Sequence, residues 1–128
     1  MPCPIVPLAP KPAAVSARTP RALSASDQAE VEKLWRQGQE AMQAGRTDEA
    51  LRYWELVRSK DPSHARAAAA LQREYLNRGM DAFAAGRLPE AISQWESALR
   101  IDPDNERARA YLSRAQEHLA RTSEIGSR

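Results

Sequence analysis

Few side chains of this 128-residue sequence have the type and spacing that catalysis requires. Its two histidines, His64 and His118, are 54 residues apart and fall on separate expected helices. A nucleophile needs a base within hydrogen-bonding reach, but the only cysteine, Cys3, lies near the chain start, and no serine stands in a nucleophile-elbow context. We interpret His64 as a helix-start residue and His118 as a solvated helical position. The sequence therefore predicts that the chain is not an enzyme.

Phosphate-binding and metal-binding patterns also fail. The stretch from Gly38 to Gly45, followed by Arg46, comes nearest to a phosphate-binding loop, yet six residues rather than four separate the glycines and no Gly-Lys-Ser/Thr follows. The carboxylates Asp48 and Glu49 stand at an expected helix start, where they complement the helix dipole. We therefore expect no metal site and no cofactor.

The composition indicates a soluble helical domain. Hydrophobic residues make up 42% of the chain, charged residues 28% and aromatic residues only 5%, and β-branched residues are few. No apolar run approaches the roughly twenty residues that cross a bilayer. Residues 1–26 carry three basic side chains and no acid, so the other 102 residues hold 16 basic and 17 acidic ones. This near-neutral mixture argues against a surface for nucleic acid or anionic membranes.

The chain start and the single cysteine bear on location. Residues 1–20 have no basic segment ahead of their apolar residues and no uninterrupted apolar run, so they do not form a secretory signal. One cysteine permits no intramolecular disulfide. We expect a cytoplasmic protein, or a periplasmic one if the chain is a processed or trimmed fragment.

Proline positions divide the chain into a tail and a helical domain. Six of the nine prolines lie in the first twenty residues, which predicts a Pro/Ala-rich disordered tail over residues 1–25. From Ser26 or Asp27, either of which can cap a helix, nearly every residue to Arg121 favours helix. We expect the domain to span 26–121 and residues 122–128 to form a disordered C-terminal tail.

An internal repeat organises the helical domain. The segment Gly38–Arg46 overlays Gly79–Arg87 with an offset of 41 residues. A glycine near the end of each segment fits the left-handed backbone conformation that ends a helix. An Asp-Pro pair further downstream ends the helix that follows. The same offset superimposes three more pairs: Glu49-Ala50 on Glu90-Ala91, Trp54-Glu55 on Trp95-Glu96, and Asp61-Pro62 on Asp102-Pro103. The helices expected from this punctuation span 27–44, 48–60, 63–85, 89–100 and 105–120.

Together these positions resemble the tetratricopeptide repeat family, whose unit of about 34 residues combines small, aromatic, glycine and proline positions. The resemblance implies an all-α, right-handed α-solenoid of helical hairpins with about five helices. Small residues would let paired helices approach closely, and a tryptophan would fill the space between hairpins. The first copy supplies Leu34, Gly38, Ala41, Gly45, Ala50, Trp54, Val57 and Pro62; the second supplies Tyr75, Gly79, Ala82, Gly86, Ala91, Trp95, Ala98 and Pro103.

Two features depart from the family pattern. The offset of 41 exceeds the usual spacing by seven residues, about two helical turns, which fall between Pro62 and Gly79. We expect the alanine-rich turns at 65–70 to pack against the second helix of the first copy. Two copies plus one helix lie near the lower limit for a solenoid, which favours self-association or docking into a larger assembly.

The resemblance implies a partner-binding site on the concave face, which the first helix of each hairpin lines. Of the expected contact residues, Trp35, Met42, Leu76 and Phe83 have a second interpretation as ordinary core between hairpins, and both interpretations remain open. Chaperone-tail recognition is not expected, because the subgroup responsible has lysine and asparagine where this chain has Trp35, Gln39, Leu76 and Met80. The expected contact residues are Trp35, Gln39, Met42, Gln43, Leu76, Met80, Phe83 and Ala84.

Three arginines also have two interpretations. Arg73, Arg107 and Arg114 either rim the concave face and accept carboxylates, or belong to the solvated surface. We expect a protein–protein interaction module or scaffold that binds a peptide or partner helix, without nucleic acid and without a membrane span. The alternative hypothesis is a structural subunit of a homo-oligomer or a larger multiprotein assembly.

Overall fold

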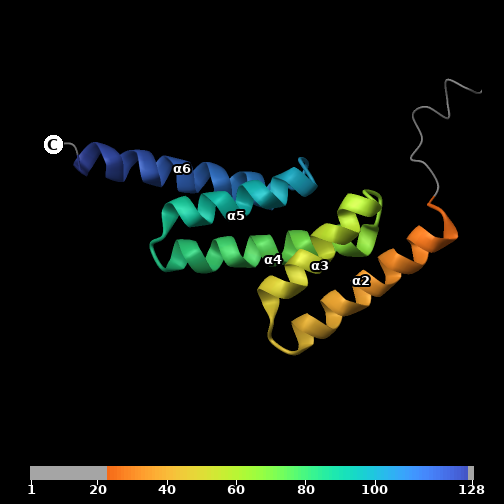
Figure 1. The fold of residues 1–128 in the computed structure, drawn as a ribbon. Coiled ribbons are helices and arrows are strands. Elements are labelled where there is room, and N and C mark those ends of the chain that lie inside the picture. The colour runs from red at the N-terminus through yellow and green to blue at the C-terminus, as the bar shows by residue number, and fades with distance from the viewer. Residues whose placement is uncertain (1–22, 127–128) are drawn as a thin grey trace, which may run out of the picture.

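The computed structural model describes residues 23–126, and every regular element in that range is an α-helix (Figure 1). The all-α prediction is therefore confirmed, and each of the five expected helices is present. The first four begin and end within two residues of their predicted bounds. The helices are α2 (Ala25–Gln43), α3 (Thr47–Lys60), α4 (Ala65–Ala84), α5 (Leu88–Ile101) and α6 (Glu106–Gly126).

The start of α2 differs from the prediction. Neither Ser26 nor Asp27 caps the helix; Ser24 does, and its Oγ accepts a hydrogen bond from the Asp27 backbone N–H at 3.1 Å. Leu23 is half-buried and packs against the core. The ordered part thus begins before the expected boundary at residue 26, while most of the predicted tail, residues 1–22, lies outside the described residues.

Glycines make the turns within the two hairpins. Gly45 and Gly86 have φ angles of 81° and 79°, in the left-handed region that other residues adopt at a cost. In both turns the backbone N–H of the following arginine bonds back to a carbonyl near the helix end, from Arg46 to Ala41 and from Arg87 to Ala82, each at 2.8 Å. The predicted helix ends are therefore confirmed.

Small residues bring the two helices of each hairpin together. A Cβ atom placed on Gly38 would lie 2.2 Å from the Nε1 atom of Trp54, and one on Gly79 would lie 2.2 Å from the Nε1 atom of Trp95. Both indoles are 2% exposed. Each tryptophan therefore packs directly onto the partner helix of its own hairpin, so the close approach is confirmed.

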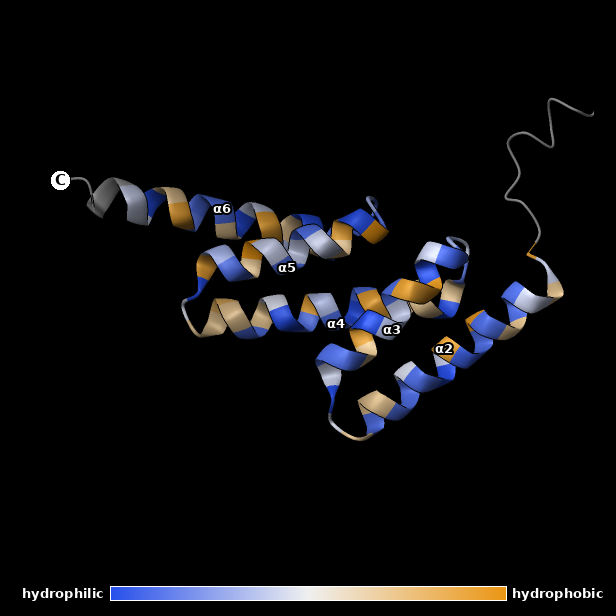
Figure 2. Ribbon diagram, viewed as in Figure 1, coloured by the Kyte–Doolittle hydropathy of each residue, from blue (hydrophilic) through white to orange (hydrophobic). Residues whose placement is uncertain are grey.

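The core consists of two clusters, and α4 contributes to both. The first joins α2 and α3 to the beginning of α4 through Ala67, Ala70 and Leu71; the second joins the end of α4 to α5 and α6 through residues that include Ala82 and Ala115. Figure 2 shows hydrophobic residues where α3 lies beside α4 and along α5. The two extra turns thus pack in the cluster that contains the second helix of the first copy, as predicted.

Helix α6 is longer than expected. It begins after Asn105, whose Oδ1 accepts a hydrogen bond from the Ala108 backbone N–H at 3.0 Å, and it continues to Gly126. The prediction that the chain leaves the helix at residue 122 is therefore wrong for residues 122–126; residues 127–128 lie outside the described range. Among residues 23–126, no helix is long and apolar enough to cross a membrane.

Candidate functional site

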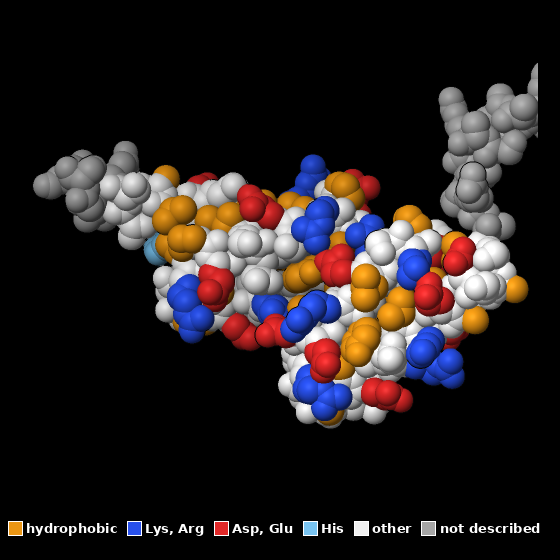
Figure 3. Space-filling view, viewed as in Figure 1, with side chains coloured by type: hydrophobic (Ala, Val, Ile, Leu, Met, Phe, Trp, Pro, Cys, Tyr) orange, Lys and Arg blue, Asp and Glu red, His pale blue; other side chains and the backbone are white. Residues whose placement is uncertain are grey.

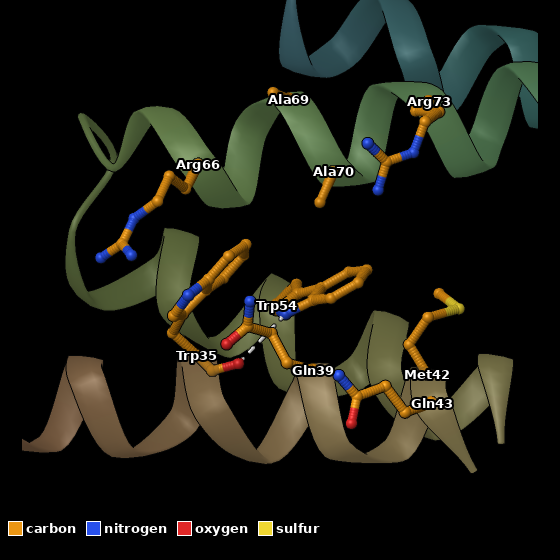
Figure 4. A pocket seen from close by; sticks show the side chains of 9 residues that line it. All are labelled: Trp35, Gln39, Met42, Gln43, Trp54, Arg66, Ala69, Ala70 and Arg73. Atoms are coloured by element: carbon orange, nitrogen blue, oxygen red, sulfur yellow. Dashed lines mark hydrogen bonds between the residues drawn. The ribbon is translucent and has the colours of Figure 1, made fainter. Parts of the chain in front are cut away.

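A hollow of about 440 Å³ lies between α2 and α4 (Figure 4). Its floor is aromatic: the ring centroids of Trp35 and Trp54 are 5.5 Å apart, and the Trp54 indole donates to the Trp35 carbonyl at 3.4 Å. Glutamine side chains reach into the hollow from α2, and arginine side chains reach toward it from α4. The lining residues are Trp35, Gln39, Met42, Gln43, Trp54, Arg66, Ala69, Ala70 and Arg73.

Two more hollows lie between α4 and α6. The middle one measures about 400 Å³ and carries amide and arginine side chains. The last one measures about 270 Å³ and is walled by aromatic rings, with the Trp95 centroid 5.9 Å from Phe83 and 5.2 Å from Tyr111. The middle hollow is lined by Ala69, Gln72, Arg73, Leu76, Asn77, Met80, Asn105, Arg107 and Tyr111, and the last by Met80, Phe83, Ala84, Trp95, Tyr111 and Arg114.

The three hollows form one continuous surface. Ala69 and Arg73 line both the first and the middle hollow, and Met80 and Tyr111 line both the middle and the last. Apart from the cap residue Asn105, Trp54 of α3 and Trp95 of α5, every lining residue comes from α2, α4 or α6. We call this surface the A-helix face.

All eight residues that the sequence predicted as contacts line the A-helix face. Four of them, Trp35, Gln39, Met42 and Gln43, meet in the first hollow. Leu76 lies in the middle hollow, and the other three lie in or next to the last: Met80, Phe83 and Ala84. The structure brings them onto one face in two groups.

The core interpretation also holds for several of these residues. Trp35 is 7% exposed and belongs to the first core cluster, so only a small part of its ring is open to the hollow. Met42, Leu76 and Phe83 are half-buried and pack against the clusters with one side. The two interpretations are therefore compatible, because one side chain can support the fold and line a hollow.

Some lining residues were not predicted from the sequence. Ala69 lies in the two extra turns, where the family pattern has no counterpart, and Gln72 follows directly after them. Tyr111 lies on α6, outside the two copies from which the contacts were taken. The offset of 41 could have found it, since Tyr111 falls on Ala70 of the first hollow.

Among the described residues that line the A-helix face, arginine is the only charged type. Arg66 bonds to Glu32 at 2.8 Å, and its guanidinium carbon lies 5.1 Å from the centroid of the Trp35 ring. The predicted rim residues Arg73, Arg107 and Arg114 all line a hollow, and all three are exposed. These three side chains thus lie at the rim of the face and are also exposed to solvent, so both interpretations describe them correctly.

Each of the two histidines contacts a neighbouring group of the fold. His64 is the N-cap of α4, and its Nδ1 accepts a hydrogen bond from the Ala67 backbone N–H at 3.0 Å, which confirms its predicted place. His118 is exposed on α6, with its ring centroid 6.1 Å from that of Phe83. Within residues 23–126, no three histidine, cysteine, aspartate or glutamate side chains come together as a metal-binding group.

Comparison with known families decides the repeat type. Residues 72–105 match the tetratricopeptide repeat family model. The match and the five-helix structure support a repeat protein of the tetratricopeptide type. Shifted by the internal offset of 41, the matched segment corresponds to residues 31–64, so the seven extra residues between the two copies are 65–71. No curated protein and no solved structure matches the chain significantly.

Proposed function

We propose that the chain is a non-enzymatic binding module that holds a segment of a protein partner along the A-helix face. Tetratricopeptide repeats generally mediate protein–protein interactions. The observation that carries the proposal is the continuity of the three hollows through Ala69, Arg73, Met80 and Tyr111, which offers a single elongated surface. Location in the cytoplasm stays a prediction.

The chemistry of the surface suits adaptable contact with a peptide. Met80 is 48% exposed and Met42 half-buried, and methionine side chains adjust to differently shaped apolar partners. Gln39 and Gln43 are exposed beside them and offer both a donor and an acceptor each. A partner segment would therefore find apolar pockets and hydrogen-bonding groups along one path.

Ala69→Trp tests the proposal by blocking that path. Ala69 is exposed and small where the first hollow meets the middle one, so an indole there fills the junction without changing charge. The probe is a set of peptides selected from a displayed library of short random sequences with the full chain as bait. We expect Ala69→Trp to weaken the selected peptides at least about tenfold, through loss of contact and steric exclusion.

Ala110→Trp is the matched control, because Ala110 is an exposed alanine of α6 that lines none of the three hollows. It should change peptide affinity less than about twofold, since it leaves the contact surface intact. Circular dichroism of both variants checks that the helices persist. Equal affinity of the parent and Ala69→Trp for every selected peptide would rule out the A-helix face as the binding surface.

A second candidate function is a structural subunit of a homo-oligomer. It is favoured by α6, where every side chain from Gln116 to Ser123 is exposed, including Leu119 at 37%. Packing of this helix against a second copy would cover Leu119. Analytical ultracentrifugation over a wide concentration range is the test: a dimer that Leu119→Glu dissociates supports the candidate, and a monomer at all concentrations excludes it.

A further inference from the structure

We infer that the partner segment is an extended peptide rich in aspartate and glutamate. This inference rests on the proposed function and adds the chemistry of the ligand. It starts from the charge of the A-helix face, which differs from that of the domain as a whole. The 102 residues after residue 26 hold 16 basic and 17 acidic side chains, yet the described residues that line the three hollows include four arginines and no aspartate or glutamate.

The four arginines are spaced along the whole face. Arg66 belongs to the first hollow, Arg73 to the first and middle ones, Arg107 to the middle one and Arg114 to the last. A peptide that follows the face therefore passes a guanidinium group in every hollow. Guanidinium groups bind carboxylates through paired N–H donors, which makes the spacing suitable for a series of acidic side chains.

Two of these arginines are free to accept such a partner. Among the described residues, Arg107 and Arg114 form no salt bridge, and Arg73 has only a distant one, 3.9 Å from Glu74. Other arginines of the fold are engaged, such as Arg100 with Glu55 at 3.0 Å. The two arginines of the face that lie on α6 therefore keep a positive charge that no ion pair with a described acid neutralises.

Surface charge elsewhere is mixed, so the acid-free lining is a local property. In Figure 3 lysine and arginine side chains alternate with aspartate and glutamate over the visible face. Close ion pairs outside the three hollows keep opposite charges together, for example Lys60 with Glu30 at 2.7 Å and Arg87 with Glu90 at 3.1 Å. An acidic ligand would meet repulsion on such surfaces and attraction on the A-helix face.

The uncharged polar side chains of the lining favour a ligand with an extended backbone over a helical ligand. Gln39, Gln43 and Asn77 are exposed and make no side-chain hydrogen bond to another described residue. Their amides can pair with the N–H and C=O groups of a peptide backbone, which an extended segment leaves open and a helix uses internally. Apolar residues between the acids would then enter the hollows beside Met80 and Phe83.

Two other occupants fit less well. Residues 1–26 of the chain itself carry Lys11, Arg18 and Arg21 and no acid, so the arginines would repel them. Single-stranded nucleic acid is anionic, but it needs exposed aromatic rings on which bases stack, and Trp54 and Trp95 are each only 2% exposed. Both occupants remain outcomes of the test.

The test uses the same library of short random peptides, with the full chain as bait at low ionic strength. We expect the enriched sequences to contain more aspartate and glutamate than the starting library, with apolar residues between them. For an enriched peptide, replacing every aspartate and glutamate by asparagine and glutamine should weaken binding at least about tenfold, and added salt should weaken the acidic form more. Enriched sequences without acids, basic proline-rich ones, or no enrichment would overturn the inference.

Arginine variants assign the effect to the face. Arg107→Gln combined with Arg114→Gln should weaken the acidic peptide about three- to tenfold, as expected for two exposed ion pairs. The matched control combines Arg52→Gln with Arg109→Gln; both are exposed, lie outside the three hollows and remove the same charge. Equal weakening by both pairs would show a non-specific charge effect and contradict the inference.

The two proposals fail in different ways. Peptides without acids that Ala69→Trp still blocks would refute the acidic ligand and leave the A-helix face as the binding surface. Peptides indifferent to Ala69→Trp would refute both. A fluorescent single-stranded RNA oligonucleotide serves as a last probe: its displacement of the acidic peptide, with tighter binding, would overturn the assignment of a protein ligand.

Discussion

At the scale of single residues, each glycine–tryptophan contact determines how closely the two helices of a hairpin pack. The indole N–H of Trp95 donates to the Leu76 carbonyl at 3.2 Å, and the ring lies against the backbone of Gly79. Trp54 repeats this arrangement with the Trp35 carbonyl and Gly38. These contacts also position the floors of the first and last hollows, so the packing of the hairpins shapes the candidate site.

Gly79→Ala should destabilise the fold. An added Cβ would lie 2.2 Å from Nε1 and 2.5 Å from Cδ1 of Trp95, so the buried ring must move. We expect overpacking to cost about 3 kcal/mol, because a buried ring must move; this exceeds the gain of about 1 kcal/mol in helix propensity, so the free energy of unfolding should fall. Urea denaturation measures the change in the free energy of unfolding, and Asn77→Ala, at an exposed position, is the control. A variant as stable as the parent would contradict the close packing.

Tyr75 belongs to a polar cluster that joins three helices. Its hydroxyl donates to the Glu55 carboxylate at 2.5 Å, and Arg100 bonds to the same carboxylate at 3.0 Å. Burial and then the contact with Glu55 raise the pKa of the Tyr75 hydroxyl to about 12. The folded protein therefore holds this proton more tightly than the unfolded chain, whose tyrosine pKa is 10.0.

The stability contributed by neutral Tyr75 is complete below pH 10 and falls as the pH rises to about 12, because the unfolded chain ionises first. We expect the free energy of unfolding of the parent to fall across this range more steeply than that of Tyr75→Phe. Chemical denaturation at a series of pH values measures both slopes. Tyr53→Phe is the control, and it should keep the slope of the parent; equal slopes for the parent and Tyr75→Phe would show that Tyr75 does not titrate as described.

At this scale the sequence predicted eight of the residues that line the face, but not how far each is exposed. Helical periodicity places Gln39, Met42 and Gln43 on one side of a helix, and they do line one hollow. Exposure depends on neighbours from other elements: Trp35 is nearly buried because Trp54 and His64 pack against it, each at 5.5 Å between ring centroids. No local pattern contains that information.

At the scale of elements, α4 connects the two halves of the domain. Its first two turns contribute to the core cluster of α2 and α3, and its last turns to the cluster of α5 and α6. The seven extra residues, 65–71, supply the first of these contributions. The insertion therefore extends the packing of the N-terminal hairpin and adds Ala69 to the candidate site.

Leu71→Ala should reveal how much α4 stabilises the N-terminal hairpin. Leu71 is fully buried at the end of the insertion, so its truncation should lower the free energy of unfolding by about 2–5 kcal/mol through lost contacts and a cavity. Leu56→Ala is the matched control; Leu56 is 47% exposed, and the change should stay within about 0.5 kcal/mol. Thermal and urea denaturation provide both values. Similar losses for the two variants would contradict the role given to α4.

Helix ends were predictable where a residue type imposes them. Gly45 and Gly86 end helices because they adopt positive φ, and Asn105 caps α6 through its side chain. Two predicted helix ends were wrong, the start of α2 and the end of α6. Ser24 caps α2 although it lies next to a proline-rich stretch that favours an extended chain. Helix α6 continues past Arg121 although the residues there include serine, threonine and glycine, which have weak helix propensity. Continuation of a helix already begun outweighs these local preferences in α6.

At the scale of the whole molecule, the first helices of successive hairpins place their side chains on one face. The path runs from α2 across α4 to α6 and carries arginine in each hollow. The sequence left Arg73, Arg107 and Arg114 as either rim residues or solvated surface, and the absence of acids from the described lining emerges only when three helices are assembled. The account therefore makes one central claim, that this face holds a partner segment.

Tryptophan indole N–H resonances test that claim most directly. Trp35 and Trp54 line the first hollow and Trp95 lines the last, so all three report on the A-helix face. In nitrogen-15 spectra of the full chain titrated with a selected acidic peptide, we expect these three indole signals and the backbone signals of α4 to shift together and saturate with one affinity. Shifts confined to the outer surfaces of α3 and α5, with the indole signals unchanged, would contradict the account.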